Sequence, residues 1–277
     1  MNINIQTYKH TNNYCMIFFS SNHSGQLLRG YKSSLSFLQK HVTLRVIPPE
    51  HNLTQNLYAI YSHNSQYKKP RVNFLGDHSS TIATGAWSLK HNPRCKFIWI
   101  DAHPDINTYD ASSTKNFHGM PLAYLTGLNT PYYPMPFPFI FNNLPFQNIL
   151  YIGIRSIDTF EQNIIDKEQI QVIDTFECNN NIQSVLHKIH NFIENDPVHI
   201  SFDVDALDPS IMPSTGTPVE NGLKKDAAIK ILQFILSHSH VYNFDISELN
   251  LEIGDEQQKE ISKQTIVDIL RGTRIIV

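Results

Sequence analysis

The chain has 277 residues, of which 41% are hydrophobic and only 17% are charged. Because charged residues make up about 25% of an average soluble protein, clusters of acidic side chains are informative here. The formal net charge is −3, from 22 Lys and Arg against 25 Asp and Glu. This balance argues against a nucleic-acid-binding surface, which needs clustered basic residues, and the hydrophobic content excludes a disordered chain. Composition alone does not explain the 14 histidines.

The start of the chain and the cysteines indicate a compartment. The first 14 residues are polar and lack the basic start and apolar run of a secretory signal, and no run approaches the ~18 apolar residues of a membrane span. Cys15, Cys95 and Cys178 are widely spaced and form no CxxC pair, so neither a disulfide framework nor a zinc knuckle is expected. We therefore expect a cytoplasmic protein without a membrane partner.

Short apolar runs alternate with longer helical patterns along the chain. In chain order, the predicted elements are strands at 14–19, 42–46 and 72–75, a helix at 79–90, a strand at 97–100, a helix at 119–125, a strand at 149–154, a helix at 159–167, a strand at 171–173, a helix at 182–195, a strand at 198–202, a helix at 223–237, a strand at 241–244 and a helix at 256–271. This alternation predicts an α/β fold with a mostly parallel sheet covered on both faces. One domain can use the whole chain, although length alone also allows two.

Acidic and imidazole side chains follow four of the predicted strands. They are Asp77 and His78; Asp101, His103 and Asp105; Asp203, Asp205 and Asp208; and Asp245 with Glu248. Ligands bind outside the carboxyl ends of the strands in open parallel sheets, so we expect these four groups to meet at one edge of the sheet. Carboxylates gathered in this way repel one another unless a cation neutralises them.

A pair of manganese ions fits this pattern. In the segment 101–105 the three polar residues alternate with Ala and Pro, so they share one face of an extended backbone, and Asp203 and Asp205 repeat the spacing. Carboxylates with a minority of imidazoles suit Mn²⁺ better than a structural zinc. With His78 added there are six candidate ligands, for which two bridged metals are the natural arrangement. Each motif alone also fits a simpler interpretation as a helix cap or a turn.

Five sequence blocks resemble the ureohydrolase family, and within it the arginases. The blocks are Gly76-Asp77-His78-Ser79, residues 99–127 with Asp-Ala-His-Pro-Asp and Asn-Phe-His-Gly, residues 151–158, residues 201–218 with Phe-Asp-Val-Asp-Ala-Leu-Asp-Pro, and Glu248-Leu249-Asn250. The similarity covers about residues 70–277. It implies a three-layer α/β/α sandwich with a mostly parallel central sheet. It also implies a single domain over 1–277, with residues 1–70 as a divergent N-terminal part.

The resemblance implies a dinuclear manganese hydrolase with two Mn²⁺ per subunit. It assigns one ion to His78, Asp101, Asp105 and Asp203, and the other to His103, Asp101, Asp203 and Asp205. A metal-bridging hydroxide would attack the guanidinium group of L-arginine, and the products would be L-ornithine and urea. The implied partners are this small substrate and further copies of the chain, as a trimer or hexamer, with no nucleic acid.

The same resemblance assigns roles around the substrate. The residues expected to bind the α-carboxylate are Asn107, Ser112, Thr114 and Asn116. Asp158 would bind the α-amino group, and Thr217 would line the pocket. Glu248 would hold the guanidinium, Asp105 would hand a proton to the leaving nitrogen, and His118 would exchange protons with solvent.

The chain departs from the family pattern at several positions. Leu75 replaces the first Gly of Gly-Gly-Asp-His, and Leu251 follows Asn250 where Pro is usual. Thr114 and Lys115 stand where Ser-Gly is common, and the first ~70 residues lack the family's opening loop. Three other functions stay open: an agmatinase or other guanidino-acid hydrolase, a formiminoglutamate hydrolase that releases formamide, and a non-catalytic scaffold.

Overall fold

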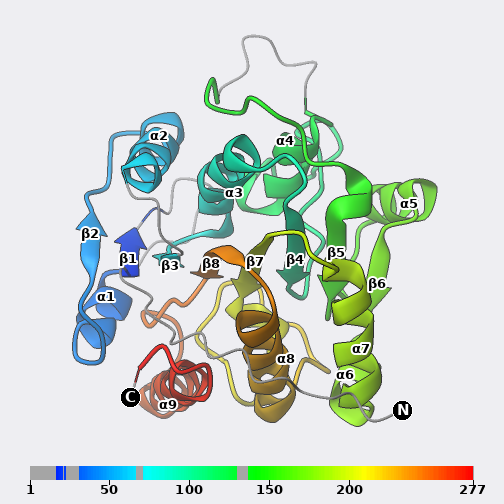
Figure 1. Cartoon of the computed structure of the whole chain (residues 1–277). Helices are drawn as coiled ribbons and strands as arrows, with labels where there is room; N and C mark the ends of the chain where they lie inside the picture. Colours follow the sequence, from blue (N-terminus) through cyan, green and yellow to red (C-terminus); the bar gives the residue numbers. More distant parts are fainter. Residues whose placement is uncertain (1–16, 21, 23–30, 67–70, 130–136, 277) are drawn as a thin grey trace.

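Residues 17–20, 22, 31–66, 71–129 and 137–276 are described in the computed structural model. Within them, eight strands form one sheet in the order β2-β1-β3-β8-β7-β4-β5-β6, and each neighbouring pair is parallel (Figure 1). The strands are β1 Ile17–Ser20, β2 Arg45–Ile47, β3 Arg71–Leu75, β4 Lys96–Ile100, β5 Ile149–Ile152, β6 Gln171–Ile173, β7 Val198–Asp203 and β8 Val241–Ser247. The predicted parallel sheet is therefore confirmed.

Helices cover both faces of this sheet and complete three layers (Figure 1). They are α1 Lys32–Leu38, α2 Leu53–Ser65, α3 Thr81–His91, α4 Pro121–Thr126, α5 Thr159–Glu168, α6 Thr175–Asn180, α7 Ile182–Ile193, α8 Lys225–His238 and α9 Glu256–Gly272. One apolar core lies between the sheet and α2 to α5, and the other between the sheet and α1 with α6 to α9. None of the described helices combines the length and apolar content needed to cross a membrane.

The central strands are buried along nearly their whole length because both of their faces are covered, whereas the edge strands β2 and β6 each have two exposed residues. In β4, Phe97 and Trp99 pack into the core beneath α3, while Ile98 and Ile100 pack into the opposite core. Successive side chains of a strand point to opposite faces, so a strand between two helical layers shows a continuous apolar run rather than an alternating one. This is the pattern from which all eight strands were predicted.

The helices α1, α2 and α6 were not predicted, whereas the other six lie where a helix was expected. The buried face of α2 carries Asn56 and Asn64 beside Leu57, Ile60 and Tyr61, so its apolar periodicity is weak. α1 and α6 are short. Residues 14–16, assigned to the first predicted strand, lie outside the described residues.

The predicted end of the last strand was wrong, and the error concerns Asp245. β8 continues to Ser247, so Asp245 lies inside the sheet and not at its edge. Its carboxylate accepts hydrogen bonds from Asn73 Nδ2 at 2.6 Å and from Thr84 Oγ1, and lies 3.2 Å from His199 Nε2. These partners are all buried, so Asp245 belongs to a polar network beneath α3 rather than to the edge where ligands bind.

Candidate active site

Four neighbouring strands at the centre of the sheet bring the predicted site residues together. β3, β8, β7 and β4 adjoin in that order. His78 follows β3, residues 101–105 follow β4, Asp203 ends β7, and Glu248 follows β8. The carboxyl ends of parallel strands open onto one edge of the sheet, so residues as distant in sequence as His78 and Glu248 are in direct contact.

His78 stands at the centre of the first group of candidate metal ligands. Its Nδ1 atom lies 3.1 Å from Asp101 Oδ2, 2.8 Å from Asp105 Oδ2 and 3.1 Å from Asp203 Oδ2. Its Nε2 atom lies 2.7 Å from Ser201 Oγ, a contact that orients the ring as in metal-binding histidines. All four acidic and imidazole side chains are buried. One imidazole nitrogen cannot neutralise three carboxylates, so this group lacks positive charge.

His103 and Asp205 form a second group that shares Asp101 with the first. His103 Nδ1 lies 3.1 Å from Asp205 Oδ2 and 3.6 Å from Asp101 Oδ1. Asp101 therefore presents one oxygen to each group, as a bridging ligand does. Asp203 Oδ1 accepts the backbone N–H of Asp205 at 2.9 Å, and its Oδ2 faces His78. Asp203 therefore reaches the second group through a backbone hydrogen bond, whereas Asp101 reaches both groups through its side chain.

The electrostatics of these side chains fit bound cations. Burial and the charges of Asp205 and Asp101 raise the pKa of Asp203 well above its usual value, and burial and Asp101 raise the pKa of Asp205 to about 6. His78 Nδ1 and Asp101 Oδ2, although close together, are buried without a well-formed hydrogen bond to described residues. One ligand atom from each of His78, Asp101 and Asp105 lies within 4.8 Å of the other two, and the same holds for Asp101, His103 and Asp205. Such carboxylate-rich groups suit divalent metals.

Glu248 and His118 form a pair beside the metal ligands. Glu248 Oε1 lies 3.5 Å from His118 Nδ1 and accepts the backbone N–H of His78 at 2.9 Å. Burial opposes a charge on His118, but the hydrogen bond and charge of Glu248 outweigh it and raise the pKa of His118 to about 9. The His118 side chain is 19% exposed and that of Glu248 is 3% exposed, so His118 connects the buried carboxylate with solvent.

The residues predicted to bind the amino-acid end of a substrate contact one another. Asn107 Nδ2 donates a hydrogen bond to Asp158 Oδ2 at 2.8 Å. Thr114 Oγ1 accepts the backbone N–H of Asn116 at 3.3 Å and lies 3.4 Å from Ser112 Oγ. These contacts order the loop that follows the metal ligands of β4.

Thr217 and Lys115 make contacts that the sequence did not indicate. Thr217 Oγ1 donates a hydrogen bond to Asp205 Oδ2 at 3.1 Å, so it orients a candidate metal ligand. Lys115 has a left-handed backbone, with φ 61°, and its Nζ donates to the carbonyls of Tyr109 at 2.6 Å and Asp110 at 3.1 Å. Its ammonium group is thus held on its own turn, where the side chain is exposed.

The tight turn before His78 depends on Gly76 and accommodates Leu75. A Cβ atom at Gly76 would lie 1.9 Å from the carbonyl oxygen of Asn22, which accepts the backbone N–H of Asp77 at 2.7 Å. Leu75 is the buried last residue of β3. The close approach of backbone to backbone therefore occurs at Gly76, and the departure from Gly-Gly is absorbed by the core.

Sequence reasoning missed two residues that support the site. Glu161 accepts the backbone N–H groups of Ile106 and Asp158, each at 3.1 Å, and so joins the loop after β4 to the start of α5. The capping-box spacing of Asp158 and Glu161 could have revealed this role. Arg155 joins the segments after β5 and β7 by donating to the carbonyls of Gly153, Asp205, Ala206, Leu207, Val219 and Glu220.

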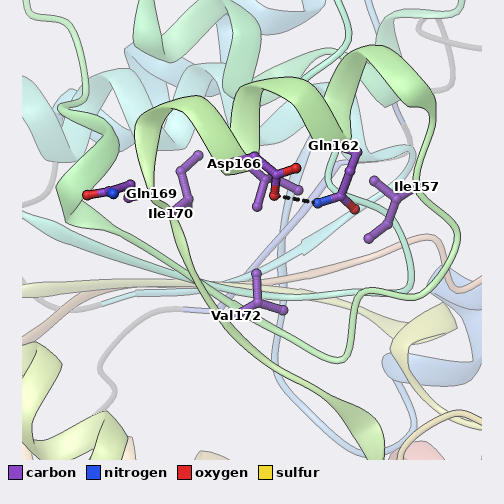
Figure 2. Close-up of a pocket in the computed structure, with 7 residues that line it drawn as sticks. Ile157, Gln162, Asp166, Gln169, Ile170 and Val172 are labelled. Atoms are coloured by element: carbon purple, nitrogen blue, oxygen red, sulfur yellow. Dashed lines mark hydrogen bonds between the residues drawn. The ribbon is translucent and has the colours of Figure 1, made fainter.

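A separate groove lies between α5 and the edge strand β6, with a volume of about 460 Å³ (Figure 2). The residues lining it are Ile157, Gln162, Ile165, Asp166, Gln169, Ile170 and Val172. Gln162 Nε2 donates a hydrogen bond to Asp166 Oδ1 at 2.8 Å across its wall (Figure 2). None of the predicted site residues lines this groove.

The sequence is similar to those of known arginases. The family model described as the arginase family matches residues 30–272. An arginase of Glaciozyma antarctica is 36% identical over 201 residues, which are 70% of this chain and 58% of that protein. The chain thus spans less than two thirds of the length of curated arginases such as this one.

Solved structures extend the similarity to nearly the whole fold. The crystal structure of Entamoeba histolytica arginase in complex with L-ornithine has a TM-score of 0.80 and 25% identity, and the match covers 93% of this chain and 97% of that one. The Bacillus subtilis arginase has a TM-score of 0.75 and 26% identity over 93% of this chain and 98% of its own.

Proposed function

This chain belongs to the arginase family, and we propose that it hydrolyses the guanidinium group of L-arginine to L-ornithine and urea with two Mn²⁺ per subunit. The observation that carries the proposal is the position of the Glu248–His118 pair. It lies against His78, so a carboxylate able to bind a guanidinium adjoins the candidate metal ligands. Ornithine, the ligand of the Entamoeba histolytica structure, is the expected product.

The metal ligands are assigned from the two groups of side chains. His78, Asp101, Asp105 and Asp203 would hold one manganese, and His103, Asp205, Asp101 and Asp203 the other. When bound, the metals supply an activated water as the nucleophile near neutral pH. The protein's own contribution is to hold Asp101 between the two groups and to orient His78 through Ser201 and Asp205 through Thr217.

Glu248 would bind the cationic guanidinium. Although burial opposes its charge, contacts with His118, with the Tyr31 hydroxyl and with the backbone N–H of His78 keep the pKa of Glu248 below its usual value. The carboxylate therefore stays ionised and can form a charge-assisted contact with a forked guanidinium donor. This places the reacting carbon beside the metal ligands, since Glu248 touches His78 directly.

Two residues would move protons. Asp105, beside His78, would take one proton of the attacking water and give it to the leaving nitrogen, because an amine leaves only after protonation. His118 would pass the other proton that this water loses to solvent, since it lies between the buried Glu248 and the surface. An imidazole is suited to this task because it changes charge near physiological pH.

The amino-acid end of the substrate would be recognised by the loop after β4. The carboxylate ligands proposed are Asn107, Ser112, Thr114 and Asn116, with Asp158 for the α-amino group. The Asn107–Asp158 hydrogen bond joins the loop after β4 to the start of α5, and the contacts of Thr114 with Ser112 and Asn116 order the turn at 112–116. An amide and hydroxyls opposite an acidic side chain suit a zwitterionic amino acid better than a simple amine, which favours arginine over agmatine.

Urea release after loading with Mn²⁺ tests this function. The purified chain is expected to release urea from L-arginine faster than from agmatine and to release no formamide from formiminoglutamate. Faster turnover of agmatine would indicate an agmatinase, and formamide would indicate a formiminoglutamate hydrolase. A chain that binds manganese but hydrolyses none of these compounds would be a scaffold.

Assembly and location are further parts of the proposal. The resemblance to ureohydrolases supports a homo-oligomer, a trimer or hexamer, and the widely spaced cysteines support a cytoplasmic location. Light scattering on the purified chain measures the first, and fractionation of the source cells measures the second. A monomeric mass, or recovery of the chain with membranes, would contradict the corresponding part.

A further inference from the structure

The first turn of α1 is attached to the segment that follows β8. Tyr31, the residue before α1, is buried and donates its hydroxyl proton to Glu248 Oε2 at 2.7 Å. Ser34, one turn later, donates to the carbonyl of Leu249 at 2.7 Å and accepts the backbone N–H of Leu251 at 3.3 Å. Residues three apart on a helix lie on the same face, so Tyr31 and Ser34 form one contact surface, here called the α1 clamp.

The clamp matches a departure of the sequence from the ureohydrolase pattern. Leu251 stands where that pattern has Pro. Proline has no backbone N–H, so a chain with Pro here could not form the hydrogen bond that Leu251 gives to Ser34. The segment 31–34 lies near the start of the match to the family model, which begins at residue 30. A position that departs from the pattern thus contacts α1 directly, beside Glu248.

The clamp restrains the carboxylate that faces the site. Glu248 has a left-handed backbone, with φ 64°, a conformation that costs energy in a non-glycine residue and persists where its surroundings hold it. Its Oε1 accepts the backbone N–H of His78, and its Oε2 accepts the Tyr31 hydroxyl. Two separate segments therefore hold the two oxygens, the turn after β3 at Oε1 and the start of α1 at Oε2.

The Tyr31 hydroxyl orients Glu248 without neutralising it. A phenol donates one hydrogen bond and carries no charge, so the carboxylate keeps its full negative charge for a cation. Burial and the charge of Glu248 raise the pKa of Tyr31 well above its usual value, which keeps the proton on the phenol. A lysine or arginine at this position would instead compete with the substrate by satisfying the charge of Glu248.

We infer that Tyr31 is a positioning residue for substrate recognition, which fixes the Glu248 carboxylate so that it can receive a guanidinium group. The inference rests on the proposed function, because the contact between Glu248 and a guanidinium belongs to that proposal. It gives the N-terminal part of the chain a role in selecting the substrate.

Tyr31→Phe removes the hydroxyl and keeps the ring in the core. The KM for L-arginine is expected to rise about 10-fold, the effect of losing one hydrogen bond to a charged group, while kcat falls less and bound manganese is unchanged. Inhibition by L-norleucine, which keeps the amino-acid end but has no guanidinium, is expected to stay the same. The matched control is Ser34→Ala, which weakens the clamp without touching Glu248 and should keep KM within about twofold.

A double-mutant cycle tests the contact independently of activity. Y31F should lower the melting temperature less in the E248Q background than in the wild type, because E248Q has already removed the negative charge of the acceptor. If KM is unchanged in Y31F, or if S34A raises it equally, the positioning role is wrong even though the wild type releases urea. If the wild type releases no urea from L-arginine, the proposed function is wrong. The cycle then still shows whether Tyr31 fixes Glu248. If Y31F lowers the melting temperature equally in the wild type and in E248Q, the inference is overturned.

Discussion

Two buried clusters of aspartate and histidine lie on the same central strands, and they differ in the partners that surround them. Beneath α3, Asp245 receives hydrogen bonds from neutral donors, and His199 Nδ1 lies 3.0 Å from Ser88 Oγ. At the edge of the sheet, His78 faces Asp101 and two further carboxylates. In the first cluster protein donors satisfy the carboxylate of Asp245, and this cluster is here called the closed network. The second cluster is a set of acids without enough protons or cations.

This difference separates a structural cluster from a binding site better than composition does. Both clusters contain a buried carboxylate and an imidazole in contact. Buried polar groups are tolerated where each finds a partner, as Asp245 does with amide and hydroxyl donors. Buried carboxylates that face one another need a cation. The same substitution, Asp to Asn, should therefore act on metal binding in one cluster and on stability in the other.

Asp101→Asn is expected to have the largest effect on activity. Asn keeps the shape of the side chain but loses the negative charge that both ligand groups share. Bound manganese should fall from two per subunit toward none, and urea release should fall by more than about 100-fold, the upper range for weaker changes around a metal site. Elemental analysis after gel filtration and a urea assay measure the two effects. Retention of both metals would contradict the bridging position of Asp101.

Asp245→Asn, the same change in the closed network, should act on stability instead. An amide at this position either turns its NH₂ group toward Asn73 Nδ2, which is also a donor, or takes the acceptor away from the Thr84 hydroxyl. A buried donor that loses its acceptor costs about 1–3 kcal/mol, so the unfolding free energy should fall by this order while the manganese content of the folded fraction stays at the wild-type level. Urea-induced unfolding followed by fluorescence measures it. Loss of metal without loss of stability would place Asp245 in the binding site after all.

The contrast between the clusters also explains what the sequence could reveal. The grouping of the candidate metal ligands could be predicted because alternating polar residues directly follow strands, as at 101–105, and the ends of parallel strands meet. Asp245 was misplaced because nothing local distinguishes a polar residue inside a covered strand from one just beyond its end. Its partners Asn73 and Thr84 lie 172 and 161 residues away.

The contacts of the N-terminal part could not be predicted for the same reason. Tyr31 meets Glu248 across 217 residues of sequence, and no spacing rule connects them. Glu161 is the opposite case, since its contact with Asp158 spans three residues and follows a known capping pattern. Local signals therefore find ligands and caps, whereas side chains that position them through distant contacts emerge only from the fold.

His118→Asn tests the Glu248–His118 pair, which lies beside the candidate metal ligands at the edge of the sheet. Its imidazole contacts Glu248 and is partly exposed, so removing it should lower kcat by about 100-fold, the usual contribution of a proton-transferring side chain. Manganese content and melting temperature should stay close to wild type. The control is His238→Asn at the exposed end of α8, which should leave kcat unchanged. Full kcat across the pH range in H118N would remove His118 from the proton path.

The smallest effect concerns the titration of His118 in the metal-free protein. Glu248 is the main cause that raises its pKa to about 9, against the opposing effect of burial. In Glu248→Gln this pKa should therefore fall by at least about one unit, equivalent to about 1.4 kcal/mol. The raised pKa stabilises the fold fully below pH ~6.5 and ceases to do so as the pH rises through about 9. Part of the stability difference between wild type and E248Q should consequently disappear between these values.

NMR titration of the His118 ring, assigned with the H118N variant, measures the pKa. Chemical unfolding across the same pH range measures how stability depends on this titration. An unchanged pKa in E248Q would show that the charge of Glu248 does not control His118. The two clusters would then not differ in this respect, because hydrogen bonds rather than charge would determine the state of His118.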